Sequence, residues 1–203
     1  MNFGIHPSQK LQELFSDKPY QIQEPERAKL IFLGRDANWD INLEDNPLFS
    51  EFEEYFQNGI SYWENHGYHT PMLNPNYKGE GKTYHRTFKR IGFTSDYAKD
   101  ICFLELLKVP TYGKSSGKNE KEYLKMVMDD RNKTHLNRIR EIQQNTNIHI
   151  LIPYGLREII EKYSILDINS KNIFFHKHFS NPTGVSDEEI KRIRQYCLSS
   201  LNK

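Results

Sequence analysis

The chain has 203 residues, a length that suits a single domain with its own hydrophobic core. Lys and Arg total 28 against 27 Asp and Glu, so the formal net charge is +1, which excludes a strongly basic nucleic-acid coat protein. The two cysteines, Cys102 and Cys197, are too few for a disulfide framework or a four-cysteine metal site.

The hydropathy of the sequence indicates the cellular compartment in which we expect the protein. Residues 1–10 lack the apolar run of a signal peptide, and no segment approaches the roughly 20 apolar residues that cross a bilayer. We therefore expect one domain over residues 1–203, in the cytoplasm and without a membrane partner. A nearly neutral enzyme can still hold a few phosphates through backbone amides and one or two cations. The composition leaves the oligomeric state open.

Short apolar runs alternate with helical patterns along the chain. Ser8 is placed to cap a first helix that carries Leu11 and Phe15 on one face. Four runs that are apolar on both faces, as in buried parallel strands, cover residues 30–33, 101–107, 148–152 and 172–176. Further helical patterns cover residues 120–144, with a break near Asp130, then residues 156–163, and finally a helix that begins with a capping box of Ser186 and Glu189.

This alternation predicts an α/β fold with three layers, α/β/α, around a short and mainly four-stranded parallel sheet. Right-handed crossovers place the carboxyl ends of parallel strands at one edge, where ligands bind. Two segments poor in regular structure, residues 64–85 and 111–119, fall near that edge. Long loops in a compact domain are typical of binding loops or lids, so we expect the working site there.

The first predicted strand ends in a glycine turn with an acid two residues later, in the order Gly34-Arg35-Asp36-Ala37-Asn38. Gly34 permits a positive φ and a close approach of the backbone to a ligand. The amides that follow can line an anion or position a water molecule. An ordinary strand-to-loop turn with Asp36 as a cap would have the same residues, so this segment alone leaves both interpretations open.

The last predicted strand ends in a similar way, because His178, Ser180 and Asn181 follow it on a tight loop before a capped helix. An imidazole at this place can donate a hydrogen bond to the anionic oxygen of a leaving group. A structural histidine held by hydrogen bonds is the alternative interpretation. The position at the carboxyl end of a strand weakens that alternative.

Three other patterns do not reach the spacing that their chemistry requires. No strand precedes residues 6–8, which read His-Pro-Ser, and residues 113–118 are one residue short of a phosphate loop, with Asn119 where Ser or Thr belongs. The histidines at 66, 69 and 85 share a loop but lack H-E-x-x-H or comparable ligand spacing. We therefore expect neither a metal nor another cofactor.

Taken together, the two strand ends resemble the uracil-DNA glycosylase superfamily. In that family the first strand ends in G-Q-D-P-Y or G-[IM]-N-P-G, and the last ends in H-P-S-P-L-S or N-P-S-G-L-S. Residues 81–85 and 92–94 resemble the G-N-R-F-W and G-F-T of the mismatch-specific branch, and residues 104–111 resemble its T-N-L-V-K-R-P-T. Residues 153–155 stand where the family closes a strand in W-G, and the order holds over about residues 30–190.

The resemblance implies the family's fold and a role for individual residues. Asp36 would hold the attacking water or stabilise an oxocarbenium-like cation, and His178 would hydrogen-bond the oxygen of the departing base. Tyr84 would stack on a base flipped out of the helix, and Glu105 would occupy the base-reading position. Ser180 and nearby amides would take a phosphate oxygen. The other predicted substrate-binding residues are Gly34, Arg35, Ala37, Asn38 and Asn181.

Several positions depart from the family pattern. Glu105 replaces the usual Asn, and an ionised carboxylate only accepts hydrogen bonds, so it disfavours a carbonyl edge such as uracil O4. Ala37 and Phe179 replace the two prolines. Arg35 places a cation beside Asp36, where it can neutralise the acid or clamp a phosphate.

Three functional hypotheses follow from these residues. The leading one is a glycosylase-like hydrolase that releases uracil or another altered base during DNA repair, with Asp36 and His178 as the catalytic pair. Its partner would be single- or double-stranded DNA, or a nucleotide. The second is a non-catalytic nucleic-acid or nucleotide-binding protein that retains the fold. The third is a hydrolase of a small metabolite, since sheets of this kind host many functions.

Overall fold

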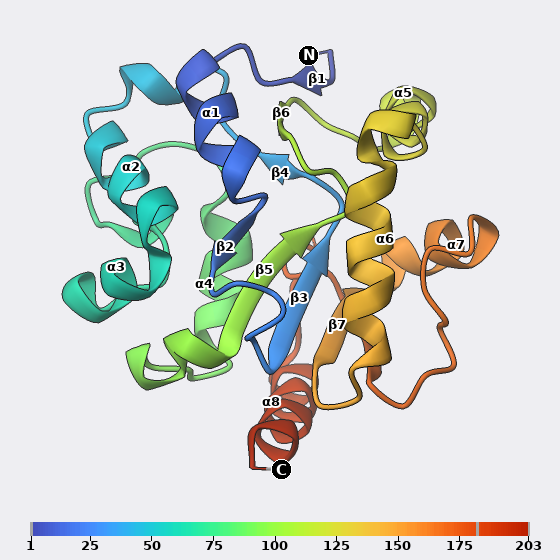
Figure 1. Cartoon of the computed structure of the whole chain (residues 1–203). Coiled ribbons are helices and arrows are strands. Elements are labelled where there is room, and N and C mark those ends of the chain that lie inside the picture. Colours follow the sequence, from blue (N-terminus) through green and yellow to red (C-terminus); the bar gives the residue numbers. More distant parts are fainter. Residues whose placement is uncertain (1, 182, 203) are drawn as a thin grey trace.

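The computed structural model describes residues 2–181 and 183–202 and has a mixed α/β fold (Figure 1). Its main sheet has five strands in the order β2-β5-β3-β7-β8. The strands are β2 (Tyr20–Ile22), β3 (Leu30–Gly34), β5 (Ile101–Glu105), β7 (His149–Pro153) and β8 (Ile173–His176). All but β2 are parallel, and β2 pairs antiparallel with β5. The predicted α/β class is confirmed. The main sheet was predicted with four strands, but it has a fifth, the antiparallel edge strand β2, which the prediction did not include.

A second, smaller sheet lies beside the carboxyl ends of these strands. It has the order β1-β6-β4, with β1 (Gly4–Ile5), β4 (Ala37–Asn38) and β6 (Pro110–Tyr112). Because β4 pairs with β6, the chain that leaves β3 is held against the chain that leaves β5. The segments after two neighbouring strands are therefore fixed to one another.

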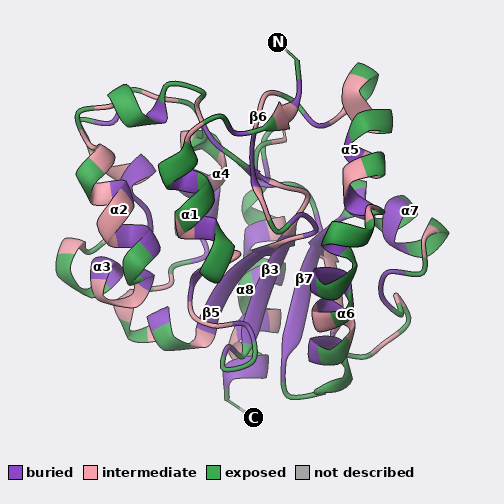
Figure 2. Ribbon diagram, turned by 45° about the horizontal axis from the view of Figure 1, so that its top comes forward, coloured by how far each residue is buried: buried purple, intermediate pink, exposed green. Residues whose placement is uncertain are grey.

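The central strands are buried on both faces, as their apolar runs predict (Figure 2). Along β3, Leu30 and Phe32 belong to one hydrophobic core, and Ile31 and Leu33 belong to another. Successive side chains of a strand point to opposite faces, so each core covers one face of the sheet.

Helices cover both faces of the main sheet (Figure 1). The core that contains Phe32 receives side chains from α1 (Gln9–Asp17), α2 (Phe49–Gln57), α3 (Gly59–His66), α4 (Lys82–Lys89) and α8 (Asp187–Leu201). The opposite core receives them from α5 (Glu120–Val127), α6 (Asp130–Gln144) and α7 (Tyr154–Lys162). Short 3-10 turns cover Leu43–Asp45, Pro71–Leu73, Ser95–Asp100 and Gly117–Asn119. No helix in the described part of the chain is long and apolar enough to cross a membrane.

The predicted helix ends are largely confirmed. Ser8 caps α1 by accepting a hydrogen bond from the Leu11 amide at 2.9 Å. The expected break near Asp130 separates α5 from α6. At α8 only half of the capping box forms, because Ser186 accepts from the Glu189 amide while the Glu189 carboxylate turns to Arg192. The segment 64–85, expected as a loop, also holds the end of α3 and the start of α4.

Candidate functional site

Four of the predicted residues meet at the carboxyl edge of the main sheet, and we call Asp36, Tyr84, Glu105 and His178 the candidate site. Gly34 and Glu105 are register partners at the ends of β3 and β5. The ring of Tyr84, from α4, lies 5.6 Å from the ring of His178, which follows β8. The charge of Asp36 acts on the pKa of both Glu105 and His178, and the charge of Glu105 acts on that of Tyr84, so the four groups lie close enough to interact electrostatically.

Asp36 is held by hydroxyl groups from the segment after β5. Thr111 donates to Oδ2 at 2.6 Å, and Ser115 donates to Oδ1 at 2.6 Å. Asn38 adds a longer contact of 3.4 Å to Oδ2. Thr111 and Ser115 are both buried, so Asp36 is an oriented carboxylate and does not cap a helix. Sequence reasoning placed residues 111–119 near this edge but did not identify these two hydroxyls.

Arg35 pairs with Glu120. Its guanidinium donates to Glu120 at 3.4 Å and to the Ser115 carbonyl at 3.2 Å, and it lies 4.3 Å from the centre of the Tyr123 ring. Its Nε is buried without a hydrogen-bond partner. Because its ion-pair partner is Glu120, Arg35 does not neutralise Asp36 by direct contact, which was one of the two roles expected for it.

Ala37 and Asn38 hold the loop after β3 in place. The methyl group of Ala37 is buried in the core, so any contact of this residue with a ligand would come from its backbone. Asn38 is exposed, and its amide donates to the Gly113 carbonyl. The two residues therefore tie the loop after β3 to the loop after β5.

His178 has a defined tautomer when its ring is neutral. The Ser180 amide donates to Nδ1 at 3.1 Å, and since a backbone amide can only donate, the ring proton lies on Nε2. The side chain is exposed at one side. Surrounding protein lowers the pKa of His178 by desolvation, Arg35 lowers it further, and Asp36 acts in the opposite direction. A neutral ring with an Nε2–H donor follows from this arrangement.

The rest of the His178 loop is organised internally. The side chain of Asn181 accepts from the Thr183 amide at 3.0 Å and from the Thr183 hydroxyl at 2.8 Å. Ser180 is exposed, and its hydroxyl remains a predicted phosphate contact. Within residues 2–181 and 183–202, neither side chain hydrogen-bonds to Asp36 or Glu105. Pro182, part of the sequence motif, lies outside the described residues.

Tyr84 lies in an aromatic cluster that also contacts His178. Its ring is 5.2 Å from Phe179 and 6.2 Å from Phe103, and the side chain is half-buried. Phe179 is 1 % exposed and also packs 6.1 Å from Phe32. Phe179 is therefore a core residue against which the ring of Tyr84 packs.

The carboxyl group of Glu105 lies directly over Gly34. A Cβ on residue 34 would be 2.7 Å from the Glu105 carboxyl carbon and closer still to one carboxyl oxygen. Gly34 is not among the residues with positive φ, so it does not use the left-handed conformation that a glycine permits. The glycine is needed for space, because it admits the Glu105 carboxyl group against the backbone of β3.

This close approach predicts that Gly34→Ala destabilises the protein through Glu105. Overpacking of this kind costs about 1–3 kcal/mol of unfolding free energy. Urea unfolding of the wild type, Gly34→Ala, Glu105→Ala and the double variant would measure the coupling between the two positions. We expect Gly34→Ala to cost much less when Glu105 is already Ala. An equal cost in both backgrounds would contradict the contact.

Behind Tyr84, two histidines form a buried pair. Nε2 of His69 lies 2.9 Å from Nδ1 of His85, and the His69 ring stacks on Phe103 at 5.8 Å. Burial lowers the pKa of His69 well below its ordinary value and that of His85 to about 3. No three His, Cys, Asp or Glu side chains in the described part of the chain converge to hold a metal ion. Both rings are therefore neutral packing groups.

Buried neutral histidines predict a loss of stability in acid. Burial also lowers the pKa of His176, to about 4. In the unfolded chain these histidines bind a proton near pH 6.5. In the folded chain His176 binds one only near pH 4 and His85 only near pH 3. Their contribution is therefore fully present above pH 6.5 and is lost as the pH falls, by about 2 kcal/mol per residue at pH 5. Urea unfolding at pH 7 and pH 5 should show a smaller difference for His85→Gln than for the wild type.

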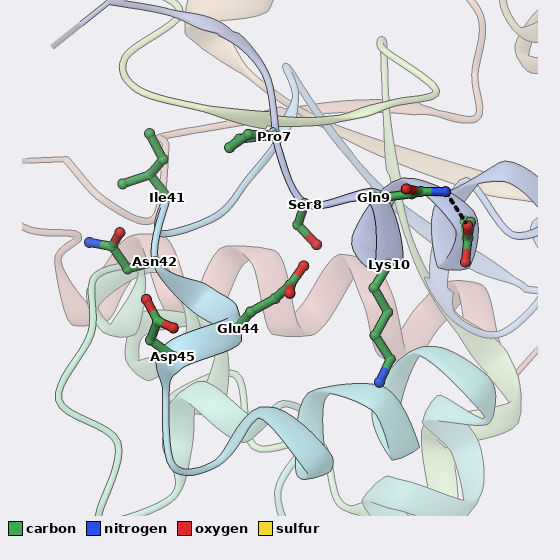
Figure 3. Close-up of a pocket in the computed structure, with 9 residues that line it drawn as sticks. Pro7, Ser8, Gln9, Lys10, Ile41, Asn42, Glu44 and Asp45 are labelled. Atoms are coloured by element: carbon green, nitrogen blue, oxygen red, sulfur yellow. Dashed lines mark hydrogen bonds between the residues drawn. The ribbon is translucent and has the colours of Figure 1, made fainter.

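A surface depression of about 680 Å³ lies elsewhere, between the start of α1 and the 3-10 turn Leu43–Asp45 (Figure 3). It includes none of the four residues of the candidate site. His6 beside it accepts from the Ser8 amide at 3.1 Å and contacts the Asp40 carbonyl at 2.9 Å. The segment His6-Pro7-Ser8 thus forms the entry to α1.

Comparison of the chain with protein-family models, curated proteins and solved structures gave no match.

Proposed function

We propose that this protein hydrolyses the N-glycosidic bond of uracil or another altered base in DNA, in a cytoplasmic repair role and on a divergent uracil-DNA glycosylase-like fold of three layers. The observation that carries the proposal is the meeting of Asp36 and His178. They follow the first and last of the four parallel strands, and the charge of Asp36 acts on the pKa of His178 at one edge of the sheet. Acid and imidazole on opposite sides of a reacting bond suit heterolytic release of a base.

Asp36 is suited to the sugar side of the reaction. Two buried hydroxyls fix its carboxylate, so its negative charge is oriented before the substrate arrives. Positive charge develops on the sugar carbon as the base departs, and a fixed carboxylate stabilises it or orients the attacking water. The hydroxyls of Thr111 and Ser115 would act as positioning groups for this carboxylate.

His178 is suited to the base side. Its Nε2–H can donate to a base oxygen on which negative charge develops, and its lowered pKa keeps the ring neutral at physiological pH. The ring of Tyr84 lies next to it and offers a surface on which a flipped base can stack. Arg35 and Ser180 remain the proposed phosphate contacts.

A strand-cleavage assay on labelled oligonucleotides tests the proposal. The panel would contain uracil, hypoxanthine, xanthine and thymine opposite each base, in single and double strands, followed by heating in alkali to break abasic sites. We expect cleavage at one or more altered bases with the wild type and its loss with Asp36→Asn. Intact strands on every substrate would contradict the proposal.

The second candidate is a non-catalytic DNA-binding protein, and one observation favours it. Both oxygens of Asp36 already accept short hydrogen bonds, which leaves fewer sites for a reacting water. Such a binder would hold oligonucleotides without cleaving them, and its affinity would fall steeply with salt because phosphate contacts release counterions. Binding without cleavage at any base would favour this candidate.

A further inference from the structure

Glu105 is an acid without a partner at the centre of the candidate site. Its backbone is anchored, since the carbonyl accepts from His135 Nε2 at 2.8 Å, and its carboxyl group rests on Gly34. No described residue donates a hydrogen bond to this carboxyl group or forms an ion pair with it. The hydroxyls of Thr111 and Ser115 donate to the neighbouring Asp36.

Among the described residues, no cation contributes to the pKa shift of Glu105. From the elements packed around it, the titratable groups coupled to its charge are Asp36, Tyr55, Tyr84, Cys102 and Tyr123. Burial raises the pKa of the tyrosines and of the cysteine, so these groups stay neutral. Burial also raises the pKa of Glu105 well above its ordinary value, and the charge of Asp36 adds to the effect. Two neighbouring acids that share no cation cannot both ionise easily.

Resting on the proposed function, we propose that Glu105 reads the base as a neutral carboxylic acid, with its O–H donating to a base carbonyl and its C=O accepting from the adjacent base N–H. A carboxylic acid in this form offers the donor and acceptor pair that a side-chain amide offers. The substrate class is then a base with neighbouring carbonyl and N–H groups, such as uracil or hypoxanthine. This reverses the expectation that Glu105 disfavours a carbonyl edge, because that expectation applies to the ionised form.

The protonation state can be measured without any activity. Carbon-13 NMR of the glutamate carboxyl groups would follow each signal with pH, and the signal missing in Glu105→Gln belongs to Glu105. We expect its midpoint well above that of an ordinary glutamate and above the pH of the binding measurements, because burial and the charge of Asp36 both raise the pKa of Glu105. A midpoint below the pH of the binding measurements would overturn the proposal whether or not the protein is a glycosylase.

The reading role needs a second measurement, with free uracil as the probe and 3-methyluracil, which lacks the N3–H group, as its matched control. We expect uracil to move the Glu105 carboxyl signal and to bind at least tenfold more tightly than 3-methyluracil. Glu105→Met, which keeps the length of the side chain but removes both oxygens, should abolish that preference. Equal binding of the two probes to the wild type would overturn the reading role.

The two proposals fail in distinguishable ways. If the wild type releases no base from DNA but the Glu105 signal and the uracil preference are as expected, hydrolysis is wrong and base reading stands. If the wild type releases uracil, Glu105→Met should lower kcat/KM on uracil by about 10- to 100-fold, since base groups left unpaired in a buried site cost about 1–3 kcal/mol. Unchanged kcat/KM in Glu105→Met would overturn base reading and leave the hydrolase intact.

Discussion

Replacing Asp36 with Asn is expected to slow base release by about 10²- to 10⁴-fold, the range that a positioned acid or base contributes to catalysis. The substitution keeps the size of the side chain but removes its charge. It also places an amide NH₂ where Thr111 or Ser115 now donates, so one short hydrogen bond is lost. The measurement is the single-turnover rate of alkali-sensitive cleavage on the best substrate of the panel.

A matched control separates this effect from a general loss of negative charge. Glu44→Gln removes an acid beside the surface depression, outside the candidate site. We expect its single-turnover rate to stay within about threefold of the wild type, since a surface charge change away from the site has a small effect. A comparable loss in both variants, or none in Asp36→Asn, would show that Asp36 does not act at the reacting bond.

The fold was predictable where the sequence repeats a physical pattern. The run Leu30–Leu33 is apolar at every position, and burial on both faces of a parallel sheet requires this. The edge strand β2 has only three residues and therefore shows no period. Helix α2 did carry a signal, because Phe49, Phe52 and Phe56 are spaced as one face of a helix.

Only those residues of the candidate site that directly follow a predicted strand could be placed from the sequence. The sequence places Asp36 and His178 at the same edge once the strands are known to be parallel. The partners of Asp36 could not be predicted, because Thr111 is 75 residues away and is brought in by the pairing of β4 with β6. The direction of Arg35 likewise depends on Glu120, which lies in a helix 85 residues later.

The contact between Gly34 and Glu105 changes the interpretation of both residues. From the sequence, Gly34 is a turn residue and Glu105 a substitution that weakens the family resemblance. In the fold they are register partners, and each explains the other: the glycine leaves space, and the acid fills it. Steric complementarity of this kind depends on strand register, which a single sequence does not reveal.

Replacing His178 with Ala is expected to slow base release by about 10²- to 10³-fold, the loss found when one donor to a developing anion is removed. The fold should tolerate the change within about 0.5 kcal/mol, because surface side chains contribute little to stability. The side chain is exposed, and the hydrogen bond it makes joins Nδ1 to a nearby loop amide. Single-turnover rates and urea unfolding of the same samples would separate the two effects.

The charge of Arg35 provides a sharper test of the same histidine. In the proposed reaction the neutral ring of His178 donates to the departing base, so the rate should fall as the pH drops through the lowered pKa of His178. Because Arg35 helps to lower that pKa, Arg35→Gln should move this acid limb to higher pH. Lys177→Gln, which removes an exposed cation next to His178 in the chain but not one that shifts its pKa, is the matched control. An acid limb at the same pH in Arg35→Gln and the wild type would mean that another group, and not His178, titrates in the reaction.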